Sequence, residues 1–162
     1  MTQTDDPLWQ QILQYHPDKQ GVTLPFSKRL ALENNWSRRY ALRVIEEYKR
    51  FVFLTCTAQH PVTPSEEIDQ AWHLHMVYTR SYWEDFCGKI LERPLHHAPT
   101  EGGKSELSKH IAQYEQTLQT YRETFGQKPP TDIWPSAQQR FKAGLWRWVS
   151  LRKYWVIRKP FF

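Results

Sequence analysis

Residues 36–56, WSRRYALRVIEEYKRFVFLTC, contain the longest helical pattern in the chain. Large side chains recur in it every three or four residues, the spacing that places them on one face of an α-helix. They are Trp36, Tyr40, Val44, Tyr48, Phe51 and Thr55, flanked by Ala41, Ile45 and Val52. Because this apolar arc is wide, we expect the helix to lie at the centre of the fold.

Shorter helical patterns lie on either side of this segment. Residues 7–15 predict one short helix, and residues 27–34 predict a second. After the central helix, Thr63 and Glu66 match the S/T-x-x-E capping box, with Pro64 in the first helical position. A further helix is therefore predicted to begin at Thr63.

The second half of the chain continues the helical pattern. We expect a bend near residues 79–81, and residues 107–125 form a clean amphipathic repeat that Gly126 ends. Strand signals are weak outside residues 140–162, so the predicted fold is all-α, a single-domain irregular bundle of about five to seven helices. The helical domain is expected to span residues 1–139. Residues 140–162, rich in tryptophan and basic residues, are expected to pack on it or to be appended to it.

Length and composition are typical of a soluble protein with one core. The 162 residues are 40% apolar and 15% aromatic, which provides ample surface to bury. The first residues lack the features of a secretory signal, and no run of 18 apolar residues suggests a transmembrane segment. Two cysteines without C-x-x-C spacing suit a reducing compartment, so a cytoplasmic location is expected.

The positive charge of the chain is concentrated at its C-terminal end. Residues 140–162 contain seven Lys or Arg and no acid, which leaves 15 basic against 17 acidic residues elsewhere. Aromatic rings alternate there with basic side chains, a pattern that suits an anionic membrane surface, nucleic acid or a protein partner. Alternatively, the tryptophans pack on the helices while the charges stay in water. The candidate residues for binding an anionic partner are Arg147, Arg152, Lys153, Arg158 and Lys159.

Four histidines fall within 25 positions, at His73, His75, His96 and His97. On a helix, Asp69 and His73 are four residues apart and share a face, whereas His73 and His75 point in nearly opposite directions. Either loop histidine could supply a third ligand beside Asp69 and His73. Three such ligands with one open position suit a divalent metal such as zinc, which activates bound water.

Other interpretations of these residues remain open. His75 lies in line with Ile68 and Trp72 and is expected in the core, and Glu66, Trp72 and His75 could all serve the fold or support the site. Glu66 and Asp69 could form a metal-free acid–base pair, although acids in a first helical turn usually complement the helix dipole. The chain is thus a candidate metal-binding or metal-dependent hydrolase-like protein. The alternative is a non-enzymatic interaction module, and no catalytic residue can be assigned.

Four segments together resemble a known family: YKRFVFLTC, PVTPSEEIDQAWHLHMVYTRSYWEDFC, LHHAPTEGG and FGQKPPTDIWP. They are similar to the helical domain of the glycine-rich domain-containing protein-like family of plants and bacteria. The resemblance spans Tyr48 to Pro135, and W-H-x-H and H-H-x-P-T-x-G-G are its most specific parts. The glycine-rich region of the longer plant members is missing. The resemblance implies a helical fold and shared positions, and it implies no particular chemistry.

Overall fold

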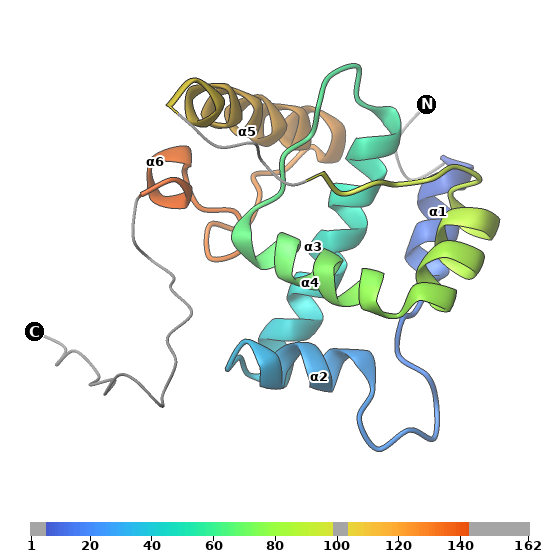
Figure 1. Ribbon diagram of the computed structural model, residues 1–162. Coiled ribbons are helices and arrows are strands. Elements are labelled where there is room, and N and C mark those ends of the chain that lie inside the picture. Colours follow the sequence, from blue (N-terminus) through green and yellow to red (C-terminus); the bar gives the residue numbers. More distant parts are fainter. Residues whose placement is uncertain (1–5, 99–103, 143–162) are drawn as a thin grey trace, which may run out of the picture.

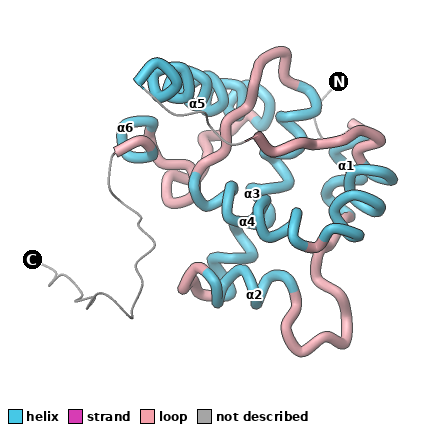
Figure 2. Tube along the Cα trace, in the orientation of Figure 1, coloured by secondary structure: helices cyan, strands magenta, loops and turns pink. Residues whose placement is uncertain are grey.

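The computed structural model describes residues 6–98 and 104–142. Within these ranges the chain contains helices and loops and no strand (Figure 2). The elements are α1 (Pro7–Gln14), α2 (Phe26–Glu33), α3 (Arg38–Thr57), α4 (Glu66–Val77), the π-helical segment η2 (Ser81–Ile90), α5 (Lys104–Phe125) and α6 (Ala137–Arg140). The prediction of an irregular all-α fold is confirmed.

Helix α3 lies at the centre of the molecule, and α1, α2 and α4 all pack against it (Figure 1). Its buried side chains, from Ala41 to Leu54, cover a wide arc of the helix, as predicted, and leave Arg43 and Glu46 exposed on the remaining side. The buried side chains include two charged residues, Glu47 and Lys49, which are 4% and 3% exposed. Buried charges require partners, and both have them. The Lys49 ammonium donates to the carbonyl of Leu13 near the end of α1, at 3.0 Å.

Helix α4 begins at Glu66, three residues later than predicted. Its N-cap is Ser65, whose hydroxyl accepts a hydrogen bond from the backbone N–H of Ile68 at 3.3 Å. The backbone N–H of Thr63 is instead bound by the Thr117 hydroxyl on α5, at 3.0 Å. The predicted start at Thr63 is therefore wrong, because a contact with a distant helix keeps the chain extended at that point.

The chain turns after α4, at Tyr78, and continues through η2 into the loop of residues 91–98. The bend predicted near residues 79–81 is thus present. Segment η2 buries Tyr82 and Phe86 against the core, and it contacts both α4 and α1. Wide π-helical turns are rare and often lie at functional sites.

Helices α5 and α6 complete the described fold. α5 buries Tyr114, Leu118 and Tyr121 from its predicted apolar face. Gly126 follows with φ of 64°, a left-handed conformation that ends the helix and favours glycine. At the end of α6, the Arg140 guanidinium donates to the Glu66 carboxylate at 2.6 Å, so this short helix is joined to the start of α4.

Among the described helices, none combines the length and apolar character needed to cross a membrane. The basic C-terminal residues predicted to bind an anionic partner lie outside the described residues, and their role remains a prediction. They are Arg147, Arg152, Lys153, Arg158 and Lys159.

Candidate metal centre

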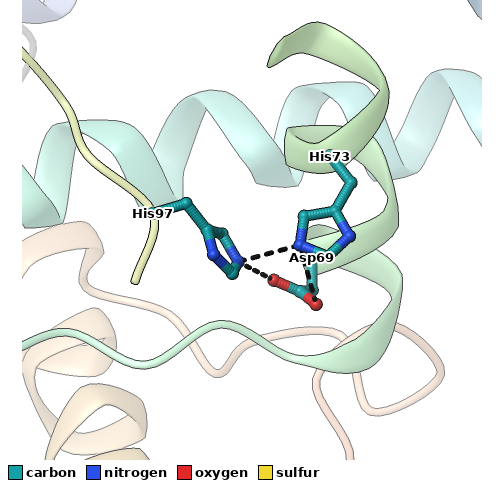
Figure 3. Close-up of side chains that lie close together, drawn as sticks. All are labelled: Asp69, His73 and His97. Carbon is teal, nitrogen blue, oxygen red and sulfur yellow. Dashed lines mark hydrogen bonds and ion pairs between the residues drawn. The ribbon is translucent and has the colours of Figure 1, made fainter. Parts of the chain in front are cut away.

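Asp69, His73 and His97 bring their side chains together at one point (Figure 3). The His97 Nε2 atom lies 2.8 Å from Asp69 Oδ1 and 3.0 Å from His73 Nε2. The second carboxylate oxygen of Asp69 is 3.8 Å from His73 Nε2. One ligand atom from each residue can be chosen so that all three lie within 4.8 Å of one another.

Two of these residues come from α4 and the third from a loop that returns to it. Asp69 and His73 are four residues apart and therefore lie on the same face of the helix, one turn from each other. His97 reaches them from the loop after η2 (Figure 3). The Asp69 and His97 side chains are 21% and 19% exposed, and that of His73 is 50% exposed, so an ion could enter from solvent.

The position of His97 Nε2 is unusual for a purely hydrogen-bonded cluster. A neutral imidazole nitrogen has one bonding direction in the ring plane, which carries either a proton or a lone pair. Yet this atom has two close polar neighbours, the Asp69 carboxylate and the His73 ring nitrogen. A proton on His97 Nε2 can bond to both Asp69 and His73 only through a bifurcated hydrogen bond. A cation placed among the three groups would be bound by the lone pairs of two imidazole nitrogens and by a carboxylate oxygen.

The separations also agree with those that a metal imposes. Ligand atoms about 2.0–2.1 Å from a tetrahedral zinc ion lie about 3.3 Å from one another. His97 Nε2 lies 2.8 Å from Asp69 Oδ1 and 3.0 Å from His73 Nε2, slightly below that value, and the other carboxylate oxygen, Oδ2, lies 3.8 Å from His73 Nε2, slightly above it. Small side-chain rotations would therefore suffice to complete three of the four positions of such an ion.

The loop that carries His97 is held by a network from the core. The indole N–H of Trp72 donates to the Tyr82 hydroxyl at 2.7 Å, and that hydroxyl donates to the carbonyl of Leu95 at 2.5 Å. The Trp72 ring also lies against the His97 ring, with centroids 4.5 Å apart. Trp72 and Tyr82 are 6% and 0% exposed. The position of His97 thus depends on two buried aromatic residues.

The neighbouring histidine, His96, does not join this cluster. It is exposed, and its ring lies against Trp83 with centroids 5.5 Å apart. Of the two loop histidines considered as a third ligand, the structure brings His97 to Asp69 and His73. Glu66 is also separate from the cluster, because its carboxylate binds Arg140.

His75 lies on the opposite side of α4, in the core. It is 1% exposed, and its ring nitrogens contact two hydroxyl groups, Tyr15 at 2.7 Å and Tyr48 at 3.1 Å. Burial lowers the pKa of His75 to about 3, so the ring is neutral at physiological pH. A neutral ring has one donor and one acceptor nitrogen, so one tyrosine hydroxyl donates and the other accepts. His75 therefore connects α1, α3 and α4.

The cluster lies at the edge of a cleft of about 670 Å³. Asp69, Trp72 and His97 form part of its lining, whereas His73 does not.

Sequence reasoning did not identify Tyr82, nor the cleft residues His110 and Arg140. The spacing of His110 from Leu107 on α5 places both on one face, but no local pattern shows that this face is opposite α4.

A family model, described as UCP032817-like, matches residues 18–131. The chain belongs to the UCP032817-like family. This match includes the three residues of the cluster, and it overturns the resemblance to the glycine-rich domain-containing protein-like family. That resemblance rested on short motifs, whereas the family model matches the greater part of the chain. No match was found among the curated proteins or among the solved structures.

Proposed function

We propose that this protein binds one divalent metal ion, with zinc as the best fit, through Asp69, His73 and His97. The convergence of their ligand atoms within 4.8 Å carries the proposal. Two imidazoles and one carboxylate are a ligand set that zinc accepts in catalytic sites, where the fourth position holds water or substrate. Softer metals prefer thiolates, and neither cysteine belongs to the cluster.

The ligand set supports a water-activating role in addition to metal storage or structural support. Structural zinc sites are usually closed by four protein ligands, whereas catalytic sites have three and leave one position open. Zinc in such a site lowers the pKa of bound water to near neutrality, which produces a nucleophile for hydrolysis. Among the described residues, the His, Cys, Asp and Glu side chains that come together here provide three ligands. A metal-dependent hydrolase-like protein is the function that fits best.

The test is elemental analysis of protein purified without a histidine tag and dialysed after incubation with zinc. We expect about one zinc ion per chain in the wild type, and strongly reduced zinc in Asp69→Asn, His73→Ala and His97→Ala. His96→Ala is the matched control, because it removes the adjacent loop imidazole and should retain the metal. A chelator should lower the melting temperature of the wild type and of His96→Ala, and leave the three ligand variants unchanged.

Two results would refute the proposal. One is a wild type that binds no metal after supplementation and whose melting temperature does not respond to chelator. The other is equal zinc content in His96→Ala and His97→Ala, because the structure separates these neighbours. In either case, Asp69, His73 and His97 would form a hydrogen-bonded cluster that supports only the fold.

A further inference from the structure

The cleft beside the cluster has the size and position of a small-molecule site. Its volume of about 670 Å³ lies within the range of 300–1,000 Å³ that is typical of ligand pockets. Part of its lining is the segment of residues 61–64 before α4, and another part comes from α5 and the end of α6. Asp69 and His97 line the cleft and His73 does not, so the unfilled position of a bound metal would face the cleft.

The charges of the lining favour an anion. Among the described residues of the lining, Asp69 is the single carboxylate, and a divalent metal would more than neutralise it. Arg140 adds a permanent positive charge, with 18% of its side chain exposed and its guanidinium carbon 5.2 Å from the centroid of the Phe141 ring. Its partner Glu66, 2.6 Å away, lies outside the lining and offsets part of this charge. Glu66 also lies only three residues before Asp69, about 4.5 Å along the helix axis, so Arg140 and the metal site are close neighbours.

The remaining lining is largely apolar, with four further polar residues, Thr63, His96, His110 and Gln113. Prolines and the side chains of Val62, Leu107 and Phe141 form its walls, and Leu107 is 45% exposed. His110 and Gln113 project into the same cleft from α5, three residues apart and hence on one face. A ligand that fills this space would need an apolar body as well as a charged group.

We propose that the cleft binds a small organic oxyanion, a carboxylate or phosphate ester with an apolar body. One anionic oxygen takes the open metal position, Arg140 attracts the charged group, and the apolar body packs against Leu107 and Phe141. This inference rests on the proposed metal site and names the class of molecule that the site accepts. Arg140 lies outside the residues matched by the family model.

The test uses the full-length protein loaded with Co²⁺, whose visible absorption changes when a metal ligand is exchanged. The probes are phenyl phosphate, phenylacetate and the neutral 2-phenylethanol, titrated by calorimetry and by absorption. We expect at least one anionic probe to bind about ten-fold or more tightly than the alcohol and to change the cobalt spectrum. The anion that binds with the higher affinity shows whether the cleft prefers a phosphate or a carboxylate.

Two variants test the cleft without altering a metal ligand. Arg140→Gln should weaken anion binding by about ten-fold, the effect of losing a charged hydrogen-bonding partner. Gln113→Glu should weaken it similarly by adding a repelling carboxylate, and it leaves the contact between Arg140 and Glu66 in place. Arg39→Gln is the control, because Arg39 is exposed and lines a different cavity.

The outcomes separate this inference from the proposed metal site. If cobalt and zinc bind at one per chain but the anions bind no better than the alcohol, the metal site stands and the oxyanion proposal is wrong. The proposal is also wrong if anions bind equally well to folded Gln113→Glu and to wild type. If no metal binds, both proposals are overturned together.

Discussion

Replacing Glu47 should destabilise this protein more than any surface charge change. One oxygen of its carboxylate, Oε2, accepts hydrogen bonds from the Tyr121 hydroxyl at 2.9 Å and from the Trp134 indole N–H at 3.0 Å. Its other oxygen forms an ion pair with Arg50. These partners belong to α3, α5 and the segment before α6, so one buried carboxylate connects three parts of the fold.

The expected loss of unfolding free energy follows from the burial of the Glu47 carboxylate. Removing one partner of a buried ion pair costs about 3–5 kcal/mol, because the remaining charge and donors are left without partners. The Arg50 side chain is 28% exposed and can regain water, so we expect Glu47→Ala to cost about 3 kcal/mol, near the lower end. For a chain of this size, that lowers the melting temperature by about 6–12 °C. Glu47→Gln keeps the shape and one acceptor oxygen, and should cost about 1.5–2 kcal/mol.

Urea unfolding followed by circular dichroism measures these free energies. Glu115→Ala is the control, because it removes the same charge from an exposed position on α5 and should change stability by less than about 0.5 kcal/mol. Tyr121→Phe removes one donor and should cost about 1 kcal/mol in the wild type, and less in the Glu47→Ala background. The reasoning fails if Glu47→Ala is no less stable than Glu115→Ala, or if the effects of Glu47→Ala and Tyr121→Phe are additive.

Three further predictions concern the site, the surface and the C-terminal end. Tyr82→Phe removes the hydroxyl that holds the loop of His97, and should weaken zinc binding about ten-fold, measured by competition with a chromophoric chelator, while the helical circular dichroism stays unchanged. The paired Arg43 guanidinium lowers the pKa of Asp132, so its stabilising effect is present above the unfolded pKa of about 3.8 and is lost as pH falls through the lower folded value. Because this pair is exposed, Asp132→Asn should cost less than about 1 kcal/mol at pH 7 and nothing in acid, as urea unfolding at several pH values can check. Deleting the chain after residue 144 should leave a folded helical protein with weaker, salt-sensitive binding to anionic vesicles in a sedimentation assay, and loss of the helical signal would contradict this.

The sequence alone determined the features that depend on local periodicity. The central position of α3 follows from an apolar arc too wide for a surface helix, and the end of α5 follows from a glycine at a position that requires positive φ. The shared face of Asp69 and His73 follows from helix geometry. Each of these depends on residues within one helix or directly after it, so no knowledge of distant contacts was needed.

Tertiary structure decided the features that depend on contacts between distant segments. Helix α4 starts after Ser65 because Thr63 is bound by α5, a contact that no capping pattern reveals. Of the two loop histidines, His97 reaches Asp69, because Tyr82 holds the loop and Trp72 packs against the ring. Neighbouring loop residues have no fixed angular relation, unlike residues on a helix. Which of them completes a site is therefore set by packing across the core, where side chains far apart in the sequence meet.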